Sequence, residues 1–337
     1  MSNAWDDIVG HQWAKELLSG AIMHNRVGHA YLITGPAHIG KTTLARTFAQ
    51  ALNCEAQDVA KRPCGQCRAC QLIASDRHPD VRLVAPTVSG RGRALIKIDA
   101  IRQLQQALSL SAYEGRYKVA ILTQFDTANI NAANAFLKTL EEPPNNVILL
   151  LTASDADTLL ETITSRCRTV GLRPLSTPLI QESLQTHWQV PPQDAHLLAH
   201  VADGRLGWAI MAHQDSSILK VRHQELEKLA EVLNGRRVER FAVAEKLFRK
   251  PETLRSLLQT WLSWWRDLLI LSKRPGSEAQ LTNIDQSEQL DAMAQGCTTD
   301  QILASLKQTS LALWQLQRNA NIRLVLENLF LTYPYRT

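Results

Sequence analysis

The stretch Ala30-Tyr31-Leu32-Ile33-Thr34-Gly35-Pro36-Ala37-His38-Ile39-Gly40-Lys41-Thr42 joins an apolar run to the pattern G-x-x-x-x-G-K-T. The run from His29 to Thr34 has the length and composition of a buried strand, and residues 41–53 have helical spacing. A loop of this pattern between a strand and a helix is typical of phosphate binding, because its glycines let backbone N–H groups surround the phosphates. The N-terminus of the helix adds partial positive charge.

The pattern also assigns roles to individual residues of this loop. Lys41 is expected to reach the β- and γ-phosphates, and Thr42 to ligate Mg²⁺ through its hydroxyl. A chance match in a turn is the alternative, and the strand–loop–helix context argues against it. The sequence therefore predicts that ATP or ADP, with Mg²⁺, binds at Gly35, Pro36, Ala37, His38, Ile39, Gly40, Lys41, Thr42 and Thr43. Hydrolysis is a separate question.

The rest of the N-terminal half alternates apolar runs with amphipathic stretches. Runs of strand length occur at 81–85, 119–122 and 147–151, and helical patterns at 99–110 and 131–142. Strands that alternate with helices predict an α/β fold with a parallel sheet covered on both faces. Helical patterns then continue to the C-terminus. We expect a nucleotide-binding domain at 1–173, a small helical domain at 174–215 and a larger all-α domain at 216–337.

Four of the six cysteines follow the predicted P-loop helix: Cys54, Cys64, Cys67 and Cys70. Zn²⁺ binds four thiolates tetrahedrally, and short C-x2-C turns bring neighbouring sulfurs to one ion. Four thiols with no evident open position predict a closed structural zinc site at 54–70, inserted in the nucleotide-binding domain. We expect it to stiffen a protruding hairpin. A redox pair and four free thiols are the alternatives.

The composition is that of a globular rather than a disordered protein, with 45% hydrophobic and 20% charged residues among 337. No apolar run is long enough to cross a bilayer. The N-terminus has no charged-then-apolar export pattern, so we expect a cytoplasmic location without membrane contact. A net charge of +5 is compatible with a nucleic-acid partner but does not demonstrate one.

Two further features bear on contact with nucleic acid. Trp261, Trp264 and Trp265 have helical spacing, and we expect them in a core or a subunit contact rather than in a base-stacking platform. The basic loop Arg91-Gly92-Arg93, with Lys97, is expected to be solvated, as short basic loops usually are.

Three more segments resemble the subunits of bacterial sliding-clamp loaders. Asn134–Pro144 is close to their N-A-L-L-K-T-L-E-E-P-P run, Thr164–Cys167 contains their S-R-C motif, and Asn319–Leu324 is similar to a pattern near the end of their helical collar domain. With the P-loop and the cysteines, the resemblance covers essentially the whole chain. It implies an AAA+ domain with a zinc insertion, a helical lid and an oligomerising collar. Trp5–Gly10 also resembles the segment that packs near the adenine in AAA+ ATPases, so Val9 joins the expected nucleotide-binding residues.

The chain departs from the ATPase pattern of this family at three positions. The strand at 119–122 should be followed by Asp-Glu, of which the Asp holds Mg²⁺ and the Glu activates water. Thr123 and Gln124 stand there instead. The lid of ATP-hydrolysing subunits resembles G-S-x-R-D-A, and here Gly207 takes the place of the arginine. These departures resemble the delta-prime type of subunit rather than the gamma/tau type, and they imply that the chain's own ATPase is weak or absent.

Arg166 belongs to the S-R-C motif, whose arginine is donated in this family to the ATP of a neighbouring subunit. Such an arginine finger accelerates hydrolysis by about 10³–10⁵. An arginine finger in a chain that lacks its own hydrolytic groups makes sense if the chain serves a partner's site. The alternative is an arginine that simply pairs with a local carboxylate.

The resemblance implies a hetero-oligomer that acts in DNA replication. Its partners would be gamma/tau and delta clamp-loader subunits, the beta sliding clamp, and primed DNA reached through the assembly. Two other interpretations stay open. One is a gamma/tau-type clamp-loader ATPase that turns over ATP by itself. The other is a zinc-stabilised DNA-binding protein with a vestigial P-loop, whose DNA binding would depend strongly on salt.

Overall fold

A computed structural model of the chain describes residues 4–88, 94–274, 281–318 and 320–335. The loop at 91–93 and Asn319 of the collar pattern lie outside these residues. Contacts divide the chain into two compact units. The N-terminal unit comprises Met1–Leu179 with Gly204–Gly207, and the helical unit comprises Ile180–Asp203 with Trp208–Thr337.

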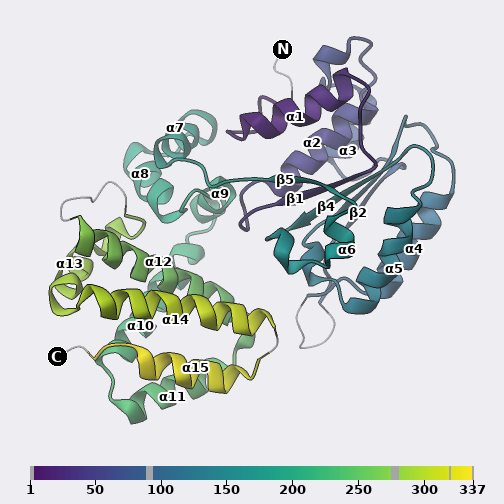
Figure 1. Ribbon diagram of the computed structural model, residues 1–337. Helices are drawn as coiled ribbons and strands as arrows, with labels where there is room; N and C mark the ends of the chain where they lie inside the picture. The colour runs from purple at the N-terminus through teal and green to yellow at the C-terminus, as the bar shows by residue number, and fades with distance from the viewer. Residues whose placement is uncertain (1–3, 89–93, 275–280, 319, 336–337) are drawn as a thin grey trace. The chain divides into compact units, whose positions relative to one another are not determined.

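The N-terminal unit is built on a five-stranded parallel sheet in the order β2-β3-β4-β1-β5 (Figure 1). The strands are β1 (Ala30–Thr34), β2 (Val81–Val84), β3 (Lys118–Leu122), β4 (Val147–Ala153) and β5 (Arg168–Gly171). The helices are α1 (Gln12–Met23), α2 (Lys41–Asn53), α3 (Arg68–Ala74), α4 (Ile98–Ser109), α5 (Ile130–Glu141) and α6 (Glu161–Thr164), with short 3₁₀ turns at Val59–Lys61, Phe125–Thr127 and Ala156–Thr158.

Helices cover both faces of this sheet because its strands are apolar on both sides. Along β1, Tyr31 and Ile33 point to one face and pack with residues of α1, α2 and α3. Ala30 and Leu32 point to the other face and pack with α4 and α5. The predicted α/β fold with a parallel sheet is thus confirmed, and the four predicted strands are all present.

Two local features differ from the expectations. The fifth strand, β5, was not predicted because it is short and half of its residues are exposed at the sheet edge. The cysteine segment is not a hairpin, since residues 54–70 form turns, a 3₁₀ turn and the start of α3. Its chain is held by turns around the sulfur atoms rather than by strand pairing.

Beyond β5, the regular structure of the described residues is all helical. The elements are α7 (Thr177–Trp188), α8 (Pro192–Val201), α9 (Leu206–Gln214), α10 (Ser217–Asn234), α11 (Arg237–Phe248), α12 (Leu254–Lys273), α13 (Ser287–Gly296), α14 (Thr299–Gln317) and α15 (Ile322–Thr332), with 3₁₀ turns at Pro251–Thr253 and Ile284–Gln286. Trp261 and Trp265 are fully buried and Trp264 nearly so, which confirms the expectation that they belong to a core. Within the described residues, no helix combines the length and the apolarity that crossing a bilayer requires.

A buried guanidinium joins the last helix of this unit to the others. Arg240 on α11 is fully buried. It donates hydrogen bonds to the carbonyl oxygens of Phe330 (2.6 Å), Tyr333 (2.8 Å) and Pro334 (2.8 Å) around the end of α15. It also lies 3.9 Å from the ring centroid of Tyr335. Carbonyl groups at a helix C-terminus carry partial negative charge, so they compensate this buried cation.

Replacing Arg240 by alanine is expected to lower the free energy of unfolding of the helical unit by about 3 kcal/mol or more, because several buried carbonyl groups lose a charged donor. Urea unfolding followed by tryptophan fluorescence measures this change. Arg249→Ala is the control, since Arg249 forms an exposed pair with Glu245. Similar unfolding midpoints for the two variants would contradict the role given to Arg240.

Candidate functional site

The phosphate-binding loop lies between β1 and α2, as the sequence predicts. Gly35 and Gly40 have positive φ angles of 142° and 107°, which favour glycine. A side chain at position 35 would also approach the carbonyl oxygen of Leu172 within 2.7 Å. The Nζ of Lys41 donates to the carbonyl oxygens of Gly35 (2.6 Å) and Pro36 (2.7 Å), so the ammonium group is held at the loop.

The N-terminal segment is attached to this loop through a histidine that sequence reasoning missed. The Nε2 of His11 donates to the carbonyl oxygen of Ile39 at 3.1 Å. Burial lowers the pKa of His11, which favours the neutral ring. Val9 is partly buried two residues before it, and Lys15 donates to the carbonyl oxygen of Ile8. The segment that carries Val9 is therefore fixed next to the loop.

The residues after β3 and β4 lie at the same edge of the sheet as the loop, because all the strands are parallel. Thr123 is buried, and its N–H and hydroxyl both donate to the carbonyl oxygen of Val84 (2.8 and 3.3 Å). Gln124 has a left-handed conformation (φ 50°), and its N–H donates to the hydroxyl of Thr152. Neither side chain brings a carboxylate to this edge.

A carboxylate that the sequence analysis did not consider lies two residues further along. Asp126 accepts hydrogen bonds from the hydroxyl (2.5 Å) and the N–H (3.2 Å) of Ser154. The carbonyl oxygen of Ser154 in turn accepts from the N–H of Gly35. Ser154 thus links Asp126 to the phosphate loop by hydrogen bonds on both sides. Only the pairing of β3 with β4 reveals this proximity.

Gly207 packs directly on the loop. Its N–H donates to the carbonyl oxygen of His38 at 2.9 Å. A Cβ at position 207 would lie 2.6 Å from that same oxygen, a distance that side chains essentially never adopt. The arginine that the ATPase pattern expects at this position therefore has no room in the present packing.

Arg166 lies in the turn between α6 and β5. Its guanidinium contacts Glu141 at the end of α5 (Nη2 to Oε1, 2.8 Å) and donates to the carbonyl oxygen of Thr162 (2.8 Å). About a third of its side chain and half of that of Glu141 are exposed (36% and 49%), so solvent screens the pair and little stability depends on it.

The four clustered cysteines converge in space. Their sulfur atoms all lie within 4.8 Å of one another, and those of Cys54 and Cys67 are 4.0 Å apart. Four thiolates around zinc at Zn–S distances of about 2.3 Å have sulfur–sulfur separations of roughly 3.8 Å. The donor set and its dimensions therefore fit a tetrahedral, closed zinc site.

Backbone N–H groups support negative charge on these sulfurs. The N–H groups of Cys64, Cys67 and Cys70 point at the sulfurs of Cys54, Cys64 and Cys67, respectively. Burial acts to raise the pKa of Cys64, but hydrogen bonds from the backbone of Cys67 and Gln66 and from neighbouring thiols lower it to about 7. The Cys64 thiol therefore ionises readily, whereas burial raises the pKa of Cys54 and of Cys70.

Contacts anchor this module to the segment that leads to His11. The indole N–H of Trp5 donates to the carbonyl oxygen of Arg62 (3.0 Å), and the N–H of Ala4 to that of Pro63 (3.2 Å). On the other side, the amide of Gln50 on α2 donates to the carbonyl oxygen of Cys70. The module thus connects the P-loop helix to the chain's opening segment.

Comparison with known proteins identifies the family. The family described as "DNA polymerase III, delta subunit" matches residues 10–176. Over 324 residues, the chain is 32% identical to the delta-prime subunit of DNA polymerase III from Bacillus subtilis, and the match covers 94% of both chains. The chain belongs to the clamp-loader subunits of DNA polymerase III.

Other clamp-loader subunits match over shorter parts. The delta-prime subunit from Pseudomonas aeruginosa is 40% identical over 160 residues, 47% of each chain. The tau subunit from Bacillus subtilis is 28% identical over 86% of this chain, which spans 55% of the length of that tau subunit. Both subunit types are therefore related to this clamp-loader chain.

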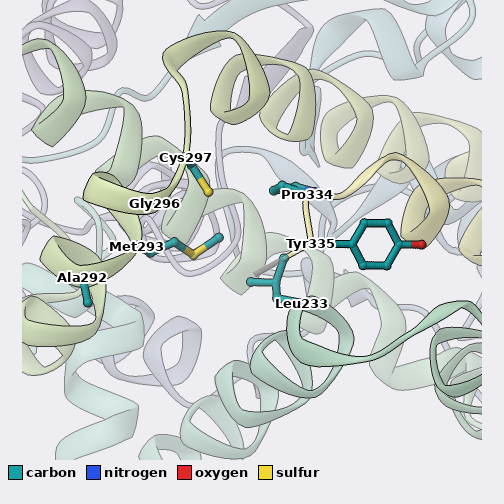
Figure 2. Close-up of a pocket in the computed structure, with 7 residues that line it drawn as sticks. All are labelled: Leu233, Ala292, Met293, Gly296, Cys297, Pro334 and Tyr335. Atoms are coloured by element: carbon teal, nitrogen blue, oxygen red, sulfur yellow. The ribbon is translucent and has the colours of Figure 1, made fainter. Parts of the chain in front are cut away.

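Two cavities of this clamp-loader subunit lie within the helical unit. One cavity has a volume of about 300 Å³ and is lined by residues of α10, α12 and α13, among them Trp264 and Met293. A smaller one of about 80 Å³ is shown in Figure 2 and is lined by Leu233, Ala292, Met293, Gly296, Cys297, Pro334 and Tyr335. Neither lining contains a residue of the phosphate loop or of the cysteine cluster. These cavities therefore take no part in the predicted phosphate and zinc sites.

The reduced protein is expected to contain about one equivalent of zinc, measured by atomic emission. Cys64→Ser combined with Cys67→Ser should remove the metal and lower the melting temperature, because binding of a structural metal contributes to folding. Cys297→Ser, outside the cluster, is the control and should retain both. A metal content well below one equivalent in the reduced wild-type chain would remove the zinc site.

Proposed function

We propose that this chain is the delta-prime subunit of the DNA polymerase III clamp loader. It binds ATP or ADP with Mg²⁺ at 35–43, hydrolyses little or no ATP, and donates Arg166 to the ATP site of a neighbouring subunit. In a cytoplasmic hetero-oligomer with gamma/tau and delta subunits, it helps to load the beta sliding clamp on primed DNA. Zinc, held by the four cysteines, is structural.

The observation that carries this proposal is the position of Arg166 relative to the phosphate loop. Parallel β1 and β5 are adjacent, with Tyr31 opposite Arg168 and Thr34 opposite Gly171. Gly35 follows β1 at the carboxyl edge of the sheet, whereas Arg166 precedes β5 at the amino edge. The paired strand segment alone separates these edges by about 10 Å. An arginine at the amino edge is turned away from its own site and suits a site on another molecule.

The groups around the chain's own loop support weak hydrolysis. A Mg²⁺ ion beside the loop would be ligated by Thr42 and would neutralise phosphate charge. Thr123 and Gln124 supply no carboxylate there, and the hydroxyl of Thr123 already donates to the carbonyl oxygen of Val84. The space that an arginine at position 207 would need is occupied by the carbonyl group of His38. Binding without efficient turnover is the function that these groups favour.

The remaining assignments complete the proposal. Val9, on the segment fixed by His11, lines the adenine side of the nucleotide site. Residues 174–215 act as the lid and residues 216–337 as the collar through which the subunits assemble.

A gamma/tau-type ATPase is the second candidate, and Asp126 is the observation that favours it. Its carboxylate lies one residue from the loop, through Ser154. If Asp126 took over the role of the missing acidic groups, the isolated chain would hydrolyse ATP and Asp126→Asn would abolish that activity. The hydrogen bonds from Ser154 to Asp126 argue against this role, because they already occupy one of its oxygen atoms.

Arg166→Ala is expected to lower ATP hydrolysis of a reconstituted clamp-loader complex by about 10³-fold at the site that it serves. The measurement is DNA-stimulated phosphate release. Glu141→Gln breaks the local ion pair but keeps Arg166, and should leave hydrolysis near the wild-type rate. Arg102→Ala, an exposed arginine on α4, is the surface control. Hydrolysis at the wild-type rate with Arg166→Ala would end the arginine-finger assignment.

The isolated chain is expected to bind ADP and ATP but to turn over ATP at no more than background rates with Mg²⁺. Lys41→Ala should abolish binding, because it removes the cation that reaches the phosphates. Calorimetric titration and a coupled ATPase assay measure the two properties. Rapid turnover by the wild-type chain would favour the gamma/tau type. Tight, salt-dependent DNA binding whose affinity is unchanged by Lys41→Ala would favour the zinc-stabilised DNA-binding alternative.

A further inference from the structure

The segment before α1, residues 4–10, forms turns and bends without a helix or strand of its own. The N–H of Ile8 donates to the carbonyl oxygen of Trp5, and both side chains are buried in a core that includes residues of α1 and α2. A segment without regular structure has few backbone hydrogen bonds of its own, so contacts with its neighbours keep it in position.

One end of this segment is attached to the cysteine module. The indole N–H of Trp5 donates to the carbonyl oxygen of Arg62 at 3.0 Å, and the N–H of Ala4 donates to that of Pro63 at 3.2 Å. These two acceptors directly precede Cys64 in the sequence. A change in the backbone before Cys64 would therefore displace both acceptors.

The module itself has little regular structure to hold these acceptors. Residues 54–70 contain one 3₁₀ turn and the start of α3, and three of their backbone N–H groups point at cysteine sulfurs. The guanidinium of Arg62 donates to the carbonyl oxygen of Ala56 at 2.7 Å. Since the four sulfurs converge, a zinc ion would hold this chain together, and folding of such modules depends on their metal. The position of the Arg62 carbonyl group would then depend on zinc.

The other end of the segment is attached to the phosphate loop. The Nε2–H of His11 donates to the carbonyl oxygen of Ile39 at 3.1 Å. The Nζ of Lys15 on α1 donates to the carbonyl oxygen of Ile8 at 3.0 Å. These two contacts hold the chain on both sides of Val9, the residue expected beside the adenine. The segment therefore joins the cysteine module to the nucleotide side of the sheet.

The helix α2 is a second connection between the module and the loop, but its order does not require a metal. It has 13 residues, and nine of them are buried. Backbone hydrogen bonds along the helix and this packing hold it in place. The segment 4–10 is thus the connection whose order zinc binding can change.

We propose that zinc at the cysteine module and nucleotide at the phosphate loop bind cooperatively, and that Trp5 is the positioning residue that couples the two sites. The inference rests on the proposed nucleotide binding at 35–43 and on zinc binding by the four cysteines. With zinc bound, the acceptors for Trp5 and Ala4 stay in place and Val9 is held beside the nucleotide. Without zinc, nucleotide binding must also order the segment, which costs conformational entropy. The coupling acts in both directions, because each ligand favours the same ordered segment.

The coupling can be measured on the full-length chain by calorimetric titration with ADP and Mg²⁺. Chain freed of metal by chelation and dialysis is expected to bind ADP about fivefold or more weakly than zinc-loaded chain. In the reverse direction, competition with a zinc-binding dye should show that ADP raises the zinc affinity by about the same factor.

Trp5→Phe keeps an aromatic ring in the core but removes the N–H donor. This variant should retain one equivalent of zinc and should reduce both affinity ratios to less than about twofold, because a hydrogen bond of this kind contributes about 1 kcal/mol. Trp13→Phe is the matched control, since Trp13 lies on α1 with 45% of its surface exposed. It should leave both ratios unchanged.

The outcomes separate this inference from the proposed function. Zinc-loaded chain that binds no ADP would defeat nucleotide binding and this inference with it, and chain that binds no zinc would defeat the zinc site and this inference. ADP and zinc affinities that do not depend on each other would overturn the coupling alone. If the metal-free chain unfolds, the dye competition decides, because it starts from folded, zinc-loaded chain. Wild-type ratios in Trp5→Phe, or loss of zinc from that variant, would overturn the role of Trp5.

Discussion

In the N-terminal unit, β1 is hydrogen-bonded along both sides, to β4 and to β5, and all three strands run in the same direction. This buried parallel pairing positions the groups that directly follow or precede these strands. It gathers the residues after the strands, among them Gly35, Thr123 and Ser154, at one edge of the sheet. It also holds Arg166, which precedes β5, at the opposite edge. One constraint therefore separates the groups that would hold a nucleotide from the arginine that would serve another molecule.

The cysteine module has a structural consequence for the same site. It follows α2, the helix that begins at the phosphate loop, and its turns accept hydrogen bonds from Trp5 and Ala4 of the opening segment. That segment continues to His11, which bonds to the loop at Ile39. A metal that fixes the module would thus stabilise both chain segments that flank the expected adenine and phosphate positions. The module would support the proposed nucleotide site in this way without supplying a group to its chemistry.

The helical unit has its own hydrophobic core, and a buried arginine holds the end of its last helix against that core. Trp261 and Trp265 fill the centre, and Tyr333 packs against both rings. Arg240 then binds the carbonyl groups that follow α15 and fixes the end of the described chain. A buried cation of this kind is tolerated because helix-terminal carbonyl groups compensate it, and it specifies one arrangement of α11 and α15. These core and closing contacts all lie within the helical unit.

The sequence by itself determined the features that are encoded locally. The pattern Gly35–Thr42 between an apolar run and a helix predicted the loop, four apolar runs predicted four strands, and cysteine spacing predicted a metal cluster whose sulfurs converge. Tertiary structure decided what depends on contacts between distant residues. Three contacts or positions of this kind leave no periodic signal in the sequence: the hydrogen bond between Asp126 and Ser154, that between Gly207 and His38, and the position of Arg166 at the opposite edge of the sheet. Hydrogen bonds between residues 28 to 169 positions apart, and the order of the strands, are set by packing.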